Sequence, residues 1–123
     1  FLHKPFLTPP NWIFGSVWTT LFMLMGIALF IIWQKGLKKK GVKQAIQLFF
    51  IQLALNVLWS IIFFGLRSPL FAAVEIMILW AAIYATLLKF MKLDKVAGWL
   101  LVPYLAWVTF ATYLNLAIAL LNR

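Results

Sequence analysis

Residues 11–33 read NWIFGSVWTTLFMLMGIALFIIW, an apolar run of 23 residues without a charged side chain. As an α-helix this run is roughly 35 Å long, because each helical residue adds about 1.5 Å, and it can cross a hydrocarbon core of about 30 Å. Three further runs resemble it in length and composition, at residues 44–66, 70–91 and 96–121. Membrane strands are shorter and alternate apolar with polar residues, so the four runs predict membrane-spanning helices.

The composition of the whole chain also indicates a membrane protein. Hydrophobic residues make up 66% of the 123 residues and charged residues 11%, and the mean hydropathy is +1.02. Soluble domains are nearer half apolar and a quarter charged, and a chain this short cannot bury so much apolar surface in its own core. We therefore expect residues 1–123 to form a single all-α transmembrane bundle domain in contact with membrane lipid.

Residue types needed for several kinds of chemistry are scarce. The chain has no cysteine, one histidine (His3) and two acidic residues, Glu75 and Asp94. These are too few for a transition-metal site built by the protein alone, or for a hydrolase that works with acid–base pairs. We expect neither a metal site nor a conventional enzyme.

The net charge of +9 is distributed unevenly over the polar breaks between the apolar runs. Eight lysines fall in the first and third breaks: Lys35, Lys38, Lys39, Lys40, Lys43, Lys89, Lys92 and Lys95. The other side carries Lys4, Arg67 and Arg123. The positive-inside rule places loops 34–43 and 89–95 in the cytoplasm, and the proline-containing N-terminal stretch and the C-terminus outside. Because the charge is explained by topology, we do not expect a nucleic-acid partner.

The depth of each residue in the membrane can be counted from the rise per helical residue. This count places aromatic and polar side chains of all four runs in one layer, which lies in the half of the bilayer away from the lysines. Trp18, Trp59 and Trp107 lie deeper than interfacial tryptophans usually do, and their positions fit bundle packing and cavity lining equally well. Asn56 is not expected to face lipid, so it either bonds to another helix or contacts a ligand.

Other aromatic and charged residues have simpler interpretations. Trp12, Trp33 and Trp99 lie near helix ends, which is typical of interfacial tryptophans. Glu75 is the only acid within the four runs, and an acid inside a membrane is a functional candidate. Its shallow position favours a structural role instead, in which it pairs with Arg67 or reaches the headgroups.

Prolines predict two local features of the chain. Pro9 and Pro10 suit the start of a helix and force an extended shape before it. Together with Trp12 they are expected to form a stiff lid over the aromatic layer. Pro103 lies inside the fourth run, where it predicts a kink because it lacks a backbone N–H group.

Three segments together resemble a known family: KPFLTPPNWIFGSVWTTLFMLMG (residues 4–26), QLALNVLWSIIFFGLRSP (52–69) and VPYLAWVTFATYLN (102–115). They resemble the translocator proteins, also called tryptophan-rich sensory proteins or peripheral-type benzodiazepine receptors, and the lysine-rich character is similar to bacterial members. The resemblance implies a bundle of five transmembrane helices, often a homodimer, in the cell membrane. Four of those helices lie in this chain, and the first family helix is expected upstream of Phe1.

The resemblance further implies a receptor or carrier that binds tetrapyrroles such as protoporphyrin IX and drug-like isoquinoline carboxamides, without a required cofactor. Carried over by position, the ligand cavity comprises Phe14, Gly15, Val17, Trp18, Phe22, Asn56, Trp59, Phe63, Phe71, Val74, Ile78, Trp107, Phe110, Ala111 and Leu114. One alternative is light-dependent degradation of the bound porphyrin, for which Trp18 and Trp107 are the candidate oxidisable residues. A less favoured alternative is a small proton-coupled multidrug exporter, since such proteins keep their essential acid in the first helix.

Overall fold

The computed structural model describes residues 11–121, apart from the side chains of residues 11, 12 and 14. The predictions for Pro9 and Pro10, and for the side chains of Trp12 and Phe14, therefore lie outside the described residues. The helices are α1 (Asn11–Gln34), α2 (Val42–Ser60), the π-helical turn η1 (Ile61–Gly65), α3 (Pro69–Leu93), α4 (Lys95–Leu100) and α5 (Val102–Leu121).

These helices form four segments that are long and apolar enough to cross a membrane: 15–34 in α1, 42–65 in α2 and η1, 69–93 in α3, and 95–121 in α4 and α5. The prediction of an all-α, multi-pass integral membrane protein is confirmed. When η1 is counted with α2, and α4 with α5, the four helical segments begin and end within two residues of the expected runs.

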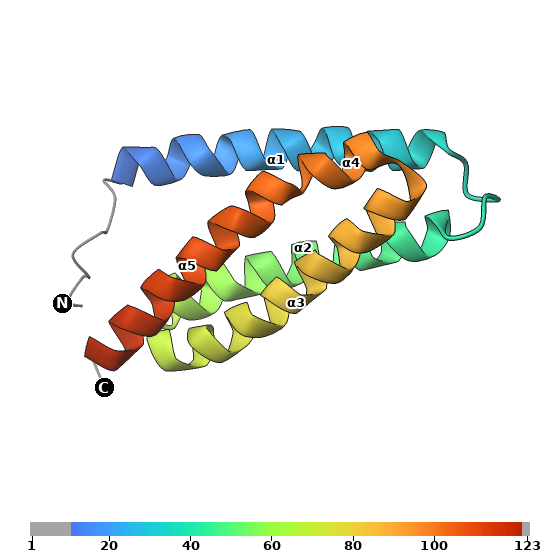
Figure 1. The fold of residues 1–123 in the computed structure, drawn as a ribbon. Coiled ribbons are helices and arrows are strands. Elements are labelled where there is room, and N and C mark those ends of the chain that lie inside the picture. The colour runs from blue at the N-terminus through green and yellow to red at the C-terminus, as the bar shows by residue number, and fades with distance from the viewer. Residues whose placement is uncertain (1–10, 122–123) are drawn as a thin grey trace.

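The helices run back and forth along one axis (Figure 1). The α1–α2 loop and the α3–α4 turn lie at one end, and the turn between η1 and α3 lies at the other, together with the start of α1 and the end of α5. Helix α3 packs against α2 and α5, whereas α1 packs mainly against α4 and α2. Helices α1 and α5 diverge with distance from the α3–α4 turn (Figure 1).

The connection from η1 to α3 is short and has three local causes. In η1 the Leu66 N–H donates to the Ile61 carbonyl oxygen five residues back, at 2.9 Å, so this turn holds one residue more than an α-helical turn. Arg67 then adopts a left-handed conformation with φ 53° and reverses the chain. Ser68 caps α3 by accepting a hydrogen bond from the Phe71 N–H at 3.4 Å, with Pro69 in the first turn.

The fourth span is broken, as the position of Pro103 predicts. Helix α4 ends at Leu100 and α5 begins at Val102. The Leu101 N–H donates to the Gly98 carbonyl oxygen at 3.0 Å, a tighter turn than that of an α-helix. Gly98 lets α4 lie directly on α3, because a Cβ atom at this position would be 2.7 Å from the Cα of Met91.

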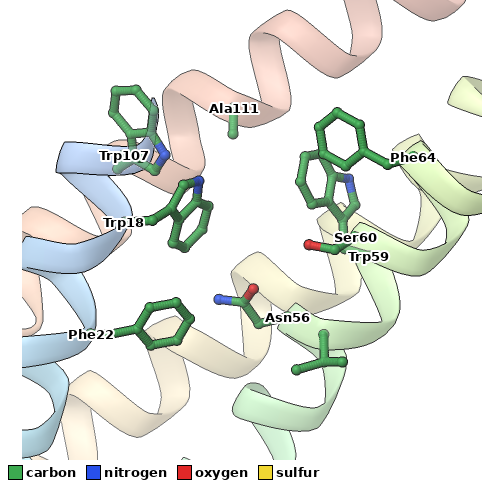
Figure 2. A pocket seen from close by; sticks show the side chains of 10 residues that line it. Trp18, Phe22, Asn56, Trp59, Ser60, Phe64, Trp107 and Ala111 are labelled. Carbon is green, nitrogen blue, oxygen red and sulfur yellow. The ribbon is translucent and has the colours of Figure 1, made fainter. Parts of the chain in front are cut away.

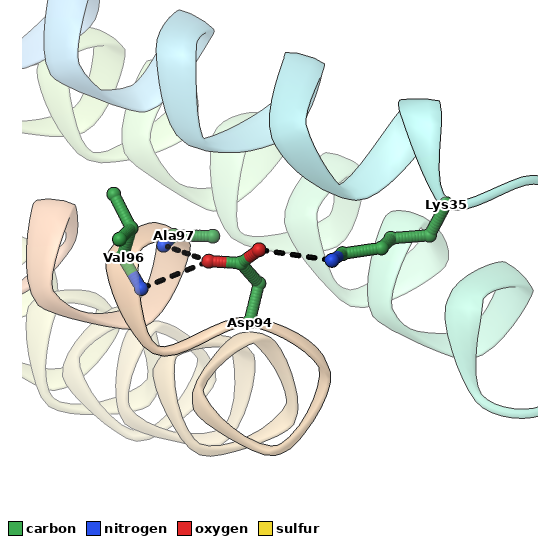
Figure 3. A network of polar contacts seen from close by, with 4 residues as sticks. All are labelled: Lys35, Asp94, Val96 and Ala97. Atoms are coloured by element: carbon green, nitrogen blue, oxygen red, sulfur yellow. Dashed lines mark hydrogen bonds and ion pairs between the residues drawn. The ribbon is translucent and has the colours of Figure 1, made fainter.

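Polar contacts tie the helices together at the lysine-rich end (Figure 3). Asp94 caps α4 by accepting hydrogen bonds from the backbone N–H groups of Val96 at 2.9 Å and Ala97 at 3.3 Å. The same carboxylate forms an ion pair of 3.0 Å with Lys35 at the end of α1. The hydrogen bond from Lys35, followed by that from Ala97, lowers the pKa of Asp94 below its ordinary value.

Candidate ligand-binding site

A cavity of about 370 Å³ lies between α1, α2 with η1, and α5, at the end opposite the lysine-rich loops (Figure 2). It is lined by Gly15, Trp18, Phe22, Asn56, Val57, Trp59, Ser60, Phe64, Trp107 and Ala111. Seven of these ten residues belong to the predicted set: Gly15, Trp18, Phe22, Asn56, Trp59, Trp107 and Ala111. The structure therefore brings together residues of three separate helices that the sequence places in one layer.

The aromatic walls of the cavity are held by ring contacts. Trp18 packs on Phe22 with ring centroids 5.8 Å apart and meets the Tyr104 ring edge-on at 6.4 Å. Trp59 stacks on a ring from η1, that of Phe63, at 5.2 Å. Such contacts fix the orientation of large rings and leave flat apolar surfaces toward the cavity.

The indole of Trp59 is also held by hydrogen bonds. Its Nε1–H donates to Oδ1 of Asn115 on α5 at 2.8 Å, and Nδ2 of Asn115 donates to the carbonyl oxygen of Pro69 at 2.8 Å. Asn115 is 1% exposed, so both of its polar groups need partners within the protein. Asn115 therefore joins α5 to α2 and to the start of α3.

Asn56 bonds to another helix and also lines the cavity. Its Nδ2 donates to the hydroxyl of Tyr104 at 2.7 Å, which links α2 to α5. The Tyr104 hydroxyl donates in turn to Oε1 of Gln52 at 2.6 Å, and Nε2 of Gln52 points to the sulfur of Met25 at 3.9 Å. Asn56 also lines the cavity, so this buried chain of polar groups ends at the cavity wall. Gln52 and Tyr104 carried no signal in the sequence beyond being polar residues within apolar runs.

Three predicted lining residues on α3 do not reach the cavity. Phe71, Val74 and Ile78 are 69%, 53% and 54% exposed, on the outward face of α3. Their neighbours Ala72 and Ile76 are buried instead, because α3 directs that stripe toward α2 and α5. These three residues, which the resemblance placed at the ligand site by position, do not line this cavity.

The π-helical turn explains a shift of one residue within the predicted site. Phe63 is buried in the core, and Phe64 lines the cavity in its place. Trp59 and Phe64 are five residues apart, which matches the i→i+5 hydrogen-bond spacing of a π-helix and not the i→i+4 spacing of an α-helix. Ser60 lies one α-helical turn after Asn56, so the stripe that begins at Asn56 could have identified it.

The remaining predicted residues lie next to the cavity without lining it. Val17 is half-buried and packs on the core, and Leu114 is buried. Phe110 is half-buried and contacts Trp107 with ring centroids 5.4 Å apart. Val57 was not predicted as a lining residue, since its apolar side chain does not stand out within an apolar helix.

Glu75 does not have the structural role expected from its depth. It is 7% exposed, and neither carboxylate oxygen has a hydrogen-bond partner in residues 11–121. No ion pair joins it to Arg67 within the described residues. The expectation that Glu75 pairs with Arg67 or reaches the headgroups is therefore wrong, since Glu75 lies next to Ile76 on the buried side of α3.

The cavity walls combine aromatic surface with few polar groups. None of the ten described residues that line the cavity is a carboxylate, a lysine, an arginine or a histidine. Within the described residues no three histidines, cysteines or carboxylates come together as a metal site would require. The walls offer flat aromatic surfaces, and Asn56 and Ser60 supply polar groups.

Comparison with known proteins gives consistent matches along the chain. The profile of the TspO/MBR family matches residues 1–121. The tryptophan-rich protein TspO of Chlorobaculum tepidum is 50% identical over 98% of this chain and 77% of its own length. The tryptophan-rich sensory protein of Cereibacter sphaeroides is 40% identical over 98% of this chain and 74% of its own. The human translocator protein is 40% identical over 93% of this chain and 68% of its own. The chain therefore belongs to the TspO/MBR family.

Proposed function

We propose that this protein is a membrane receptor or carrier that binds a flat, largely apolar ligand in the cavity between α1, α2 and α5. The ligand class is a tetrapyrrole such as protoporphyrin IX, and drug-like isoquinoline carboxamides bind at the same place. The names of the relatives, a translocator protein and a sensory protein, support a receptor or carrier role.

One observation supports this function above the others: Trp18, Trp59 and Trp107 line one cavity together with a single amide, that of Asn56. Ligand pockets of about 300–1,000 Å³ are typically apolar and aromatic, with few polar groups that orient the ligand. The cavity of about 370 Å³ has this composition. Its volume is near the lower limit, so part of a macrocycle is expected to extend past the described walls of the cavity.

Tryptophan fluorescence quenching by protoporphyrin IX, with purified protein in detergent or nanodiscs, tests the proposal. Ala111→Leu places three more carbon atoms in the cavity and is expected to weaken binding about tenfold, since overfilling a packed site costs about 1–3 kcal/mol. Ala106→Leu makes the same change on α5 at an exposed position and should leave the affinity unchanged. Equal affinities of both variants and the wild type would rule out this cavity as the binding site.

A second function is favoured by one detail of the cavity. Trp18 and Trp107, the candidate oxidisable residues, both line it, so a bound porphyrin would lie beside two indoles. Under light, with dioxygen as the oxidant, such a porphyrin could be degraded by its own photochemistry. Decay of the Soret band under illumination tests this function. The double variant Trp18→Phe/Trp107→Phe, saturated with porphyrin, should decay more slowly than the wild type, and equal rates would exclude a role of these indoles.

We also propose that the lysine-rich end is cytoplasmic. The α1–α2 loop and the α3–α4 turn lie at the same end of the bundle (Figure 1), so the eight lysines that lie in them or beside them in the adjoining helices face one side of the membrane. An excess of lysine on one side is typical of cytoplasmic loops. The cavity would then lie in the outer half of the membrane.

A further inference from the structure

The buried chain of polar groups beside the cavity has a direction, which its first member determines. Met25 is 1% exposed, and its thioether sulfur can accept a hydrogen bond but cannot donate one. Gln52 therefore turns Nε2 toward this sulfur, at 3.9 Å, and Oε1 toward Tyr104. The reverse orientation would place an oxygen against the sulfur, which are two acceptors.

The direction continues to the cavity wall. Because Oε1 of Gln52 can only accept, the Tyr104 hydroxyl uses its single proton on that bond, at 2.6 Å. The hydroxyl oxygen is then an acceptor for Nδ2 of Asn56, at 2.7 Å. This leaves Oδ1 of Asn56 without a hydrogen bond from any described residue, on a side chain that lines the cavity. Figure 2 shows the amide of Asn56 below Trp18, with its oxygen turned toward the space between the α1 and α2 aromatic rings.

We propose that Met25, Gln52 and Tyr104 set the polarity of the binding site by holding the carbonyl oxygen of Asn56 toward the ligand. The site then selects ligands whose polar edge donates a hydrogen bond, such as the neutral carboxylic acid of a tetrapyrrole side chain. The second hydrogen on Nδ2 can donate to the carbonyl oxygen of the same acid. Gln52 and Tyr104 are positioning residues, since they act through Asn56. The inference concerns the cavity of the proposed function and rests on it.

A matched pair of ligands tests the inference: protoporphyrin IX and its dimethyl ester, which keeps the ring and the carbonyl oxygens and lacks the O–H donors. Both are titrated by tryptophan quenching in mildly acidic buffer. The wild type is expected to bind the acid roughly tenfold more tightly than the ester, because the ester leaves a buried acceptor unpaired.

Substitutions along the chain should remove this preference and leave ester binding intact. Tyr104→Phe deletes only the hydroxyl and keeps the ring beside Trp18, so Asn56 can turn its N–H groups to the ester and the preference falls below about threefold. Asn56→Leu abolishes the preference for the acid. The double variant Tyr104→Phe/Asn56→Leu shows no further loss of preference than Asn56→Leu alone, because both residues act in one chain. Gln52→Leu removes the acceptor of the Tyr104 hydroxyl and replaces Tyr104→Phe in this test if that variant does not fold. Tyr84→Phe, on the exposed face of α3, is the matched control and keeps the wild-type preference.

The failures of the two proposals can be distinguished. If Tyr104→Phe or Gln52→Leu still prefers the acid over the ester as strongly as the wild type does, the inference about polarity is overturned. Ligand binding in the cavity stands in that case. Equal binding of acid and ester by the wild type overturns it as well. If neither porphyrin is bound, or Ala111→Leu weakens neither, the proposed function itself fails.

Discussion

Asp94 and Lys35 form an ion pair of 3.0 Å, and the same carboxylate caps α4 through the N–H groups of Val96 and Ala97 (Figure 3). One side chain thus joins the end of α1 to the start of α4, across the turn that follows α3. The two functions of this carboxylate can be separated experimentally, because asparagine is also a good helix cap but carries no charge.

Asp94→Asn is expected to lower the thermal unfolding temperature slightly, and Asp94→Ala to lower it by several degrees more, because alanine removes the cap as well as the ion pair. Thermal unfolding in detergent, followed by circular dichroism, measures both. The order of the effects is the critical result. Equal losses for the two variants would show that the cap contributes nothing.

The stability of the wild type should also depend on pH through Asp94. The pKa of this carboxyl is lowered in the folded protein, chiefly by the hydrogen bond from Lys35. Its contribution to the free energy of unfolding is therefore complete at pH values above the ordinary aspartate pKa of about 4. The contribution is lost as the pH falls through the lowered pKa, because the carboxylate must then be protonated. Unfolding temperatures measured from neutral pH down to about pH 3 should fall more steeply for the wild type than for Asp94→Asn.

Gly98→Ala is expected to destabilise the protein by about 1–3 kcal/mol, since overpacking has costs of this size. The added Cβ atom would lie 2.7 Å from the Cα of Met91, and a backbone atom cannot move aside as a side-chain end can. Gly26→Ala is the matched control, because a Cβ atom there would meet no atom within 4 Å. In α1 that change should be neutral or stabilising, as alanine favours helices over glycine. Equal effects of the two substitutions on denaturant unfolding would contradict the close approach of α4 and α3.

Asn115→Leu should loosen the end of the bundle where the cavity lies. It leaves the indole N–H of Trp59 and the carbonyl oxygen of Pro69 without the hydrogen bonds of 2.8 Å that Asn115 supplies, at an expected cost of about 1–3 kcal/mol. A double-mutant cycle with Trp59→Phe measures the coupling between the two side chains. Additive losses would mean that the Trp59–Asn115 bond does not contribute to stability.

Glu75→Met is expected to preserve or raise stability, by up to about 1 kcal/mol, because it removes a buried carboxyl group whose oxygens lack partners within the described residues. The unfolding temperature at neutral pH is the measurement. A clear loss of stability would show instead that the carboxyl forms an interaction that the described residues do not supply. Unchanged porphyrin binding in the variant would further weaken the interpretation of the protein as a proton-coupled exporter.

Cysteine labelling can test the proposed topology, because the chain has no cysteine of its own. In right-side-out vesicles an impermeant maleimide should label Arg67→Cys, at the turn between η1 and α3. It should label Leu37→Cys, in the lysine-rich loop, only after the membrane is opened. The reverse pattern would place the cavity in the inner half of the membrane.

The sequence was sufficient to predict the spans. A helix that crosses the hydrocarbon core must be apolar over about 20 residues, and charged residues such as the lysines are therefore found between such runs. It also grouped Trp18, Asn56, Trp59 and Trp107 correctly by depth. Depth failed for Phe71, since the height of a residue along a helix does not say which way its side chain points.

The orientation of a helix about its own axis comes from packing, and large apolar side chains lie on both the buried and the exposed sides of the helices in residues 15–121. Helix α3 exposes large apolar side chains such as Phe71 and Ile78, and buries Ala72 and Glu75. No periodicity of polar residues distinguishes these faces, because lipid and core are both apolar solvents. The partners of Asn56 and Asn115 were unpredictable for the same reason, since they lie 48 and 56 residues away along the chain, at Tyr104 and Trp59.

The π-helical turn at Ile61–Gly65 lets one wall of the cavity tolerate a change in chain length. The turn holds one residue more than an α-helical turn, so the loss of one residue there would restore a regular helix and keep the segments on either side in register. Phe64 would then follow Trp59 by four residues, which is about one α-helical turn, and both rings would still face the cavity. A single-codon deletion earlier in α2 would instead turn everything beyond it by about 100° and replace the residues of this wall.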